Sequence, residues 1–289
     1  MLPDFFVYQV GSLLDELIAR AHGGVGLQHV TKGRLEELLL WIPPRAEQEH
    51  ILQVLNEAKA LGRLRTQTDE RATKLTPALF HELFSTSTAY ETFALKELLY
   101  PIESGWSPVC QDQRAADNDW GVLKLSSVTT GRYLKDENKA LQSDFAPRPS
   151  LEVKEGDVLF SRKNTKELVA ATAYVWETRP KLMLSDLIFR LRPLQPEKLD
   201  PVYLAYALKD QVKRREIQRL ASGAAGSMPN ISKERLLTVK LAVPPPHLQR
   251  QFAKRAEEIY NLETVQAASR KRIDALFESL LHRSFQGEL

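Results

Sequence analysis

Hydrophobic residues recur at helical spacing over two long stretches of the chain, residues 47–84 and 249–281. Both stripes are apolar at their ends and polar in the middle, where the first carries Arg65 and Thr68 and the second Gln266 and Ser269. Two helices with matching patterns suit an antiparallel pair. Two independent amphipathic helices, each lying on its own core, would produce the same stripes.

The two stretches belong to a longer internal repeat. The matched segments lie 201 positions apart: Val30–Leu35 with Ile231–Leu236, Ile42-Pro43-Pro44 with Val243-Pro244-Pro245, and Gln48 with Gln249. The start of the chain also aligns with residues 201–206, so the repeat covers residues 1–85 and roughly 199–285. Self-similarity at a fixed spacing indicates a structural unit that is used twice.

Between the two copies the pattern changes to short β-like runs separated by Gly, Pro, Asn and Asp. These runs are residues 121–125, 157–160, 170–176 and 187–191, followed by a predicted helix over 201–220 and a glycine-rich loop over 222–230. Mixed strands and helices in this order predict an α+β globular domain flanked by two long helices that pack as an antiparallel coiled coil.

Little of the chain precedes the first long helix. Residues 1–22 predict one short amphipathic helix with Asp4 as its N-cap, and an apolar run over 34–42 reads as a strand that stops at Pro43-Pro44. One short helix and one strand supply too little core for a domain. We therefore expect the chain to begin inside what is elsewhere the tail of a domain. Thr76-Pro77 is expected either to kink the first long helix or to cap and restart it.

The composition excludes several classes of protein but does not indicate a function. The chain has 289 residues, a net charge of +3 and one cysteine, Cys110, so an intrachain disulfide and a cysteine-rich metal site are both excluded. Its start lacks the pattern of a signal peptide, and no apolar run approaches the roughly 20 residues of a membrane span. We expect a soluble cytoplasmic protein without membrane contact. The small positive charge permits an anionic partner but does not require one.

Motifs for catalysis are weak. The sequence lacks GxGxxG, GxxxxGK[ST] and GxSxG, and its histidines show no metal-ligand spacing. Asp144, Glu152 and Lys154 form a loose nuclease-like arrangement, since such enzymes use two carboxylates for a metal ion and a lysine beside the attacking water. That pattern is short and common, and here it leads into a predicted surface turn.

Basic and polar loops are more informative. Ser161–Lys166 follows a predicted strand, and its side chains are of the kinds that hold phosphates and contact base edges. A helix with five cations is equally consistent with an anion-binding face and a solvated face; these are Lys209, Lys213, Arg214, Arg215 and Arg219. The loop Ser222–Ser227 could present backbone N–H groups to a phosphate, although a simple turn is the commoner case.

Several motifs, in the same order, resemble those of specificity subunits of Type I restriction-modification enzymes. Residues 156–165 are similar to the family's GDLLxSRxNT stretch, and the twice-used hydrophobic-Pro-Pro-x-x-x-Gln element marks where a target recognition domain ends and a conserved helix begins. Further similar segments are 121–129, 137–139, 184–186, 222–232 and the ending 276–289. The resemblance covers nearly the whole chain.

The resemblance implies a non-catalytic, cofactor-free subunit that recognises one half of a bipartite site in double-stranded DNA. Its paired helices would act as a spacer, with methyltransferase and restriction/translocase subunits as partners. It also implies four segments: a C-terminal remnant of a first recognition domain (1–42), a spacer helix (43–85), a complete recognition domain (86–246) and a second spacer helix (247–289). Because one recognition domain is incomplete, we expect two copies of this chain, or this chain and another specificity chain, to associate.

Predicted DNA contacts lie on four loops. The residues are Ser104, Trp106, Ser107, Lys124, Ser126, Ser127, Thr129, Arg162, Lys163, Asn164, Thr165, Lys166, Ser227 and Asn230. Arg162, Lys163 and Lys166 are expected to hold phosphates, whereas Ser126, Asn164 and Asn230 are candidates for base edges. Two alternatives remain: an interaction protein that binds methyltransferase without recognising DNA, and a metal-dependent nuclease.

Overall fold

A computed structural model describes residues 1–19, 32–37, 39–85, 90–223 and 228–288. They form two compact units: residues 1–73 with 261–289, and residues 74–260. The two long helices, α4 (Arg45–Phe84) and α10 (Pro246–Gln286), each contribute residues to both units. The fold is α+β, as the sequence predicts.

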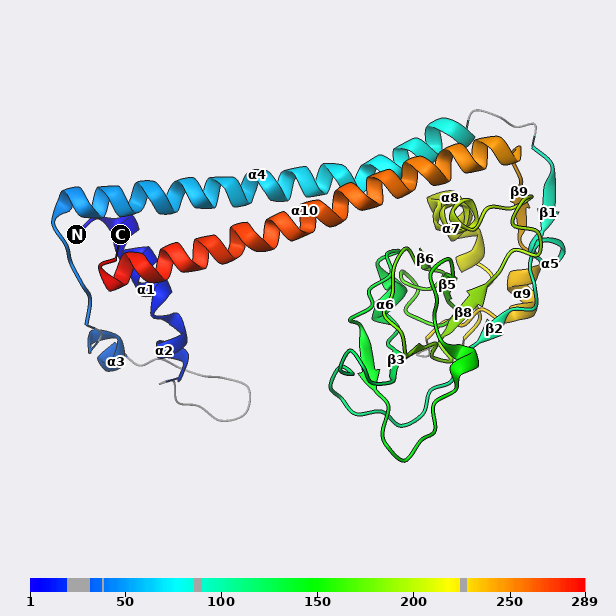
Figure 1. The fold of residues 1–289 in the computed structure, drawn as a ribbon, viewed down its shortest axis with the longest axis horizontal. Coiled ribbons are helices and arrows are strands. Elements are labelled where there is room, and N and C mark those ends of the chain that lie inside the picture. Colours follow the sequence, from blue (N-terminus) through cyan, green and yellow to red (C-terminus); the bar gives the residue numbers. More distant parts are fainter. Residues whose placement is uncertain (20–31, 38, 86–89, 224–227, 289) are drawn as a thin grey trace. The chain divides into compact units, whose positions relative to one another are not determined.

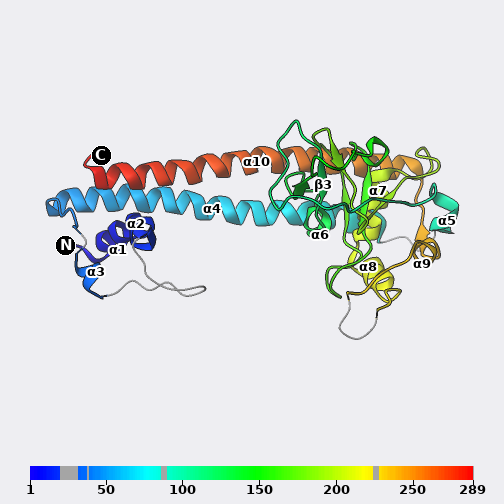
Figure 2. The ribbon, with the colours of Figure 1, turned by 90° about the horizontal axis from the view of Figure 1, so that it is seen from below.

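The first unit is helical. It contains α1 (Pro3–Ser12), α2 (Leu14–Ala19) and α3 (Lys32–Glu36), together with the first part of α4 and the last part of α10. Within this unit the two long helices run side by side in opposite directions (Figures 1 and 2). Its core consists of Phe5, Ile51 and Leu55, against which Phe277 and Phe285 pack. The predicted antiparallel pairing is confirmed here.

Three local predictions for this unit are wrong. The helix expected over residues 1–22 is two helices, because Leu13 leaves the helical ladder after α1. Its N-cap is Leu2 rather than Asp4, since Pro3 occupies the first helical position, where its missing N–H costs nothing. The strand expected over residues 34–42 is absent: α3 ends at Glu36, and described residues 39–42 have no strand partner.

The second unit holds three small sheets. The largest has the order β2 (Glu103–Ser104), β8 (Ile188–Leu191), β5 (Val158–Ser161) and β6 (Thr172–Tyr174), with all neighbours antiparallel. In the second sheet β3 (Gly121–Leu123) lies between antiparallel β4 (Asn138–Ala140) and parallel β7 (Leu182–Met183). The third pairs β1 (Thr92–Ala94) with β9 (Lys240–Ala242).

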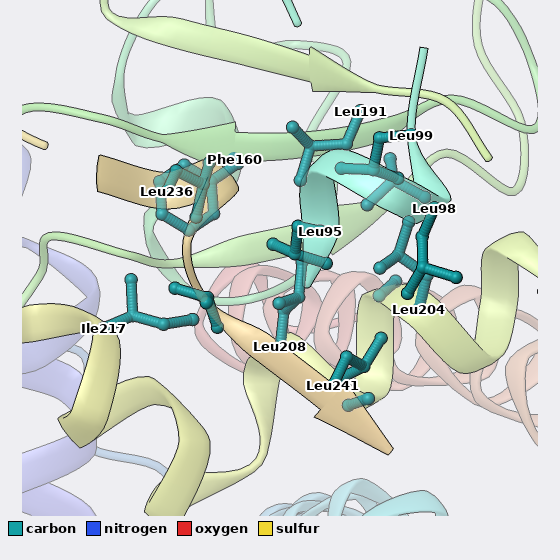
Figure 3. Packing of buried hydrophobic residues seen from close by; sticks show 14 of the residues in the cluster. Leu95, Leu98, Leu99, Phe160, Leu191, Leu204, Leu208, Ile217, Leu236 and Leu241 are labelled. Carbon is teal, nitrogen blue, oxygen red and sulfur yellow. The ribbon is translucent and has the colours of Figure 1, made fainter. Parts of the chain in front are cut away.

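Short helices connect and cover these sheets. They are α5 (Leu95–Leu98), α6 (Ser126–Thr129), the 3-10 turn η1 (Pro149–Leu151), α7 (Pro201–Lys209), α8 (Gln211–Gln218) and α9 (Lys233–Leu237). Leucines of α5, α7 and α9 meet Phe160 and Leu191 of the largest sheet in one buried cluster (Figure 3). A smaller core lies between the first two sheets, around Leu123, Leu159 and Leu182. The loops that follow β5 and β3 extend from these packed sheets.

Two further helix predictions are resolved by the structure. The helix expected over residues 201–220 is interrupted at Asp210, whose extended backbone ends α7 and whose carboxylate accepts hydrogen bonds from Val212 N and Lys213 N to cap α8. In contrast, α4 continues through Pro77, so the predicted cap and restart does not occur.

The repeated Pro-Pro-x-x-x-Gln element has a common structure in both units. Gln249 accepts a hydrogen bond from Asp200 N at 2.9 Å and donates to Pro244 O at 2.7 Å and Lys198 O at 3.0 Å. In the other unit Gln48 accepts from Leu2 N at 2.8 Å and donates to Pro43 O at 2.7 Å. Each glutamine therefore ties the start of a long helix to the start of a proline-initiated helix, α7 or α1.

The repeat also shows what residues 39–42 lack. Their equivalents form β9, which pairs with β1 and continues at Val243, where its N–H bonds Glu91 O. No segment equivalent to β1 adjoins the described part of the first copy, and Leu39 is 94% and Ile42 57% exposed. A strand here depends on a partner from far along the chain, which explains why an apolar run alone mispredicts it.

Candidate nucleic-acid interface

The loop after β5 carries the strongest concentration of predicted contacts. Its base is fixed by the main chain, because Arg162 N donates to Leu187 O and Ile231 N donates to Arg162 O. The Arg162 guanidinium lies 5.4 Å from the centre of the Phe189 ring, and Lys233 Nζ lies 5.7 Å from the same ring. Both cations thus lie within reach of a cation–π interaction with one aromatic side chain.

Three of the predicted loops meet at this point. Asn164 N donates to Pro229 O, and Lys163 forms an antiparallel bridge with Asn230, which also pairs with Ser222. On the other side, Asn164 Nδ2 donates to Thr129 Oγ1 at 3.4 Å. Segments 124–129 and 161–166 and the described residues 222–223 and 228–230, which are far apart in sequence, are therefore joined by hydrogen bonds around Asn164.

Two of the predicted DNA contacts, the base-edge candidate Asn164 and Ser127, have side chains that face inward. Asn164 is 6% exposed, and its Oδ1 accepts from Thr165 N while its Nδ2 reaches Thr129. Ser127 is 0% exposed. We assign Asn164 to positioning the loops rather than to contacting a ligand. Thr165 and Lys166 remain exposed, and neither Lys163 nor Lys166 has a carboxylate partner among the described residues.

Lys124 and Ser126 share one acceptor. Lys124 Nζ lies 2.9 Å and Ser126 Oγ 2.5 Å from Glu137 Oε2. These hydrogen bonds, first from Ser126 and then from Lys124, hold the pKa of Glu137 below its usual value. Glu137 therefore stays ionised at neutral pH and offsets the positive charge of Lys124.

The fourth predicted loop reaches the site from β2. Ser104 pairs with Phe189 across the sheet, Trp106 N donates to Leu184 O, and Ser107 exchanges hydrogen bonds with Asp186. A pocket of about 270 Å³ beside it is lined by polar and aliphatic side chains, among them Ser107, Lys124, Lys139 and Ser185. Arg148 lies over the Trp106 ring at 4.0 Å.

The predicted basic helix face is mostly structural. Lys209 Nζ donates to Gly131 O, Lys213 Nζ to Lys240 O, and Arg214 Nη2 to Glu167 O, so each cation satisfies a backbone carbonyl. Arg215 and Arg219 remain exposed. Lys209, Lys213 and Arg214 therefore form neither an anion-binding face nor a fully solvated one, the two alternatives that the sequence left open.

Remaining candidates gain little from the structure. Ser227 lies outside the described residues. The Glu152 carboxylate accepts from Lys181 N at 2.6 Å, and the described residues hold no group of three or more His, Cys, Asp or Glu that could bind a metal ion. Burial raises the pKa of the Cys110 thiol, which does not favour a reactive thiolate.

Comparison with known proteins finds relatives of one kind. The chain is 31% identical over 208 residues to the EcoEI specificity subunit of Escherichia coli, an alignment that covers 69% of this chain and 35% of that protein. It is 23% identical over its whole length to the MjaVIII specificity subunit of Methanocaldococcus jannaschii, covering 71% of that protein. The curated homologues of this chain are Type I specificity subunits. No family model matches it.

Solved structures support the fold. The S subunit of the Type I restriction-modification system from M. genitalium matches 97% of this chain and 72% of its own, with a TM-score of 0.61 at 17% identity. A second structure, from work on assembly and conformational transition of the type I R-M system, matches 99% of this chain and 72% of its own with a TM-score of 0.58 at 17% identity. The helix pair and the mixed domain are thus shared with this family. Among the described helices none is long and apolar enough to cross a membrane.

Three residues that the sequence reasoning did not select now belong to the candidate interface. Lys233 joins Arg162 at Phe189, Glu137 neutralises Lys124, and Arg148 stacks on Trp106. Each lies far from its partner in sequence, between 13 and 71 positions away. Only a motif that spans several loops could have found them.

Proposed function

We propose that this chain is a sequence-specific DNA-recognition subunit of a Type I restriction-modification complex. The observation that carries the proposal is that segments 124–129, 161–166, 222–223 and 228–230 are joined by hydrogen bonds around Asn164. The second of these segments carries Arg162, Lys163 and Lys166. The similarity of this chain to Type I specificity subunits supports the proposal. The chain spans about a third of the EcoEI subunit that it matches, so the activity of the whole protein is part of the proposal.

The roles of the loop residues follow from their surroundings. Arg162, Lys163 and Lys166 would neutralise phosphates, with Lys233 as an additional cation beside Phe189. Thr165 would face the bases because its side chain is exposed. Asn230 is partly buried and its Oδ1 is inaccessible to solvent, so it would offer a base edge its Nδ2. Ser126 would contribute only after exchanging its hydrogen bond with Glu137.

The subunit would be non-catalytic and would require no cofactor, directing methyltransferase and restriction/translocase subunits to a bipartite site on DNA in the cytoplasm. Residues 1–42 would correspond to the end of another recognition domain, with spacer helices over 43–85 and 247–289 and a complete recognition domain over 86–246. The repeated glutamine contacts support this equivalence, since Gln48 and Gln249 bind the same backbone positions in both copies. A second complete recognition domain would then come from a second copy of this chain or from another specificity chain.

DNA binding tests the proposal directly. The triple variant Arg162→Ala/Lys163→Ala/Lys166→Ala should weaken binding of the methyltransferase complex to its DNA and lower the slope of log K against log salt by up to about 3, because each lost phosphate contact removes roughly 0.9 from that slope. The control variant Lys254→Ala/Arg255→Ala/Lys271→Ala removes the same charge from exposed helix positions.

An unchanged affinity and salt slope in the loop variant would refute the assignment of these residues. A complex that forms normally but shows no sequence-selective binding, even with the unaltered chain, would favour the alternative of an interaction protein. Magnesium-dependent cleavage by the isolated chain would instead favour the nuclease.

A further inference from the structure

The helix pair of the first unit has a charged layer among its polar central positions. Arg270 Nη1 lies 3.1 Å from Asp69 Oδ2, and Arg65 Nε lies 3.5 Å from Asp69 Oδ1. The side chains of Asp69 and Arg65 are only 18% and 20% exposed. Both carboxylate oxygens of Asp69 are inaccessible to solvent, and within the described residues they have ion-pair contacts but no hydrogen bond. Such a layer contributes less to stability than apolar residues would, and it is best suited to selecting a partner.

The position of the layer within the repeat is informative. Asp69 and Arg270 are 201 residues apart, as are Gln48 and Gln249, so each of the two charged residues contacts its own repeat equivalent. In an antiparallel pair of identical helices with this geometry, a residue at that position would face its own copy. Two copies of α4 would bring Asp69 against Asp69, and two copies of α10 would bring Arg270 against Arg270.

We infer that Asp69 and Arg270 select the pairing of α4 with α10 and oppose the pairing of identical helices from two copies of this chain. Unlike charges attract in the first arrangement, whereas like charges at partly buried positions repel in the others. The repulsion is weaker for two α4 helices, since Arg65 lies beside each Asp69. It is stronger for two α10 helices, because the equivalent of Arg65 is the neutral Gln266.

The inference restricts how two copies can associate. A dimer formed through these helices would pair α4 of one chain with α10 of the other, which preserves the contact of unlike charges. It would not align α10 with α10. This conclusion concerns helix pairing alone and stands independently of DNA binding.

Complementary charge reversal provides the test. Asp69→Arg and Arg270→Asp each place like charges at the layer when α4 pairs with α10 of the same variant. An equimolar mixture of the two variants should form a 1:1 heterodimer, because the layer positions of one variant are then both cationic and those of the other both anionic. Native mass spectrometry would detect this heterodimer by its mass. We expect its dissociation constant to be at least tenfold below that of either variant alone.

The double variant Asp69→Arg/Arg270→Asp restores unlike charges within one chain. It should recover the helical circular dichroism, melting temperature and oligomeric state of the unaltered chain even if the single variants fold poorly. The control mixture uses Glu70→Arg and Lys271→Asp, which change exposed neighbours and should not produce a heterodimer. The inference is overturned if the mixture of Asp69→Arg and Arg270→Asp shows no preferred heterodimer, or if the double variant behaves no better than the singles.

Discussion

Gln249 offers a direct test of how the repeated element holds each unit together. The side chain is 1% exposed and makes three hydrogen bonds to the backbone, with Asp200 N, Lys198 O and Pro244 O. Replacing it with alanine leaves all three groups without their partner, in positions that are buried or partly buried. We expect the start of α7 to detach from the start of α10 before the rest of the unit unfolds.

The magnitude follows from the environment of each group. The Pro244 carbonyl is buried, so losing its donor costs about 1–3 kcal/mol, whereas each of the two partly buried groups costs about 0.5–1.5 kcal/mol. The expected loss is therefore about 3 kcal/mol. With a urea slope of about 2 kcal/mol per molar, the midpoint of unfolding should fall by about 1.5 M.

Urea unfolding followed by circular dichroism measures this loss, and hydrogen exchange read by mass spectrometry assigns it to a unit. Exchange should increase in peptides around residues 198–204 and remain unchanged around residues 1–8. Gln251→Ala, an exposed glutamine two positions away on the same helix, is the matched control. For Gln48→Ala, exchange should instead increase around residues 1–8 and remain unchanged around residues 198–204. The free energy of unfolding should fall by about 2 kcal/mol, less than for Gln249→Ala, because two hydrogen bonds are removed rather than three. If Gln249→Ala unfolds at the same urea concentration as Gln251→Ala, the hydrogen bonds do not stabilise the unit.

Two further predictions concern charges. Glu137→Gln should tighten DNA binding and steepen its salt dependence at neutral pH, because it frees the charge of Lys124. The folded pKa of Glu137 lies below its unfolded value of about 4.3. The stability that its ionised form contributes is therefore present above the unfolded pKa and is lost as the pH falls through the folded pKa. Equal affinities in a fluorescence titration would contradict this. Arg190→Met should lower the free energy of unfolding in urea by about 3–5 kcal/mol, because it leaves Asp157, which is 6% exposed, without its buried cation. Arg192→Met removes a side chain that is 45% exposed and should lower it by at most about 1 kcal/mol. Similar losses of unfolding free energy for the two variants would show that burial of the Arg190–Asp157 pair does not determine its contribution to stability.

The sequence predicts the long helices well because their packing is periodic. Burial on one face of a helix imposes a spacing that survives in a single chain, and the polar residues at the centre of both stripes coincide with the Asp69–Arg270 layer. Proline and glutamine in the repeated element likewise act locally, within one turn of the helix that they begin. The α+β character of residues 90–245 is readable for the same reason, since short apolar runs and turn residues alternate there.

Other features depend on partners that are distant in sequence. The helix break at Asp210 requires the carboxylate to cap α8, which competes with continuing α7, and both outcomes fit the same apolar spacing. The apolar run at residues 39–42 matches β9 in composition, yet β9 exists because β1, almost 150 positions earlier, supplies its hydrogen bonds. Pairing of this kind has no signal in the strand itself.

The candidate interface shows a similar division between residue type and role. The loop motif concentrates polar and basic side chains in one segment, but a motif does not distinguish a residue that faces a ligand from one that holds the loops together. Asn164 has the hydrogen-bonding groups of a base-contacting residue, but its side-chain amide bonds Thr129 and Thr165 instead, while its backbone N–H donates to Pro229 O. Lys124 has the charge of a phosphate contact, and Glu137 offsets it. Specificity would then rest on fewer exposed side chains than the motif contains, so changes at Asn164 should alter binding through loop position, whereas changes at Lys163 or Lys166 should alter it through charge.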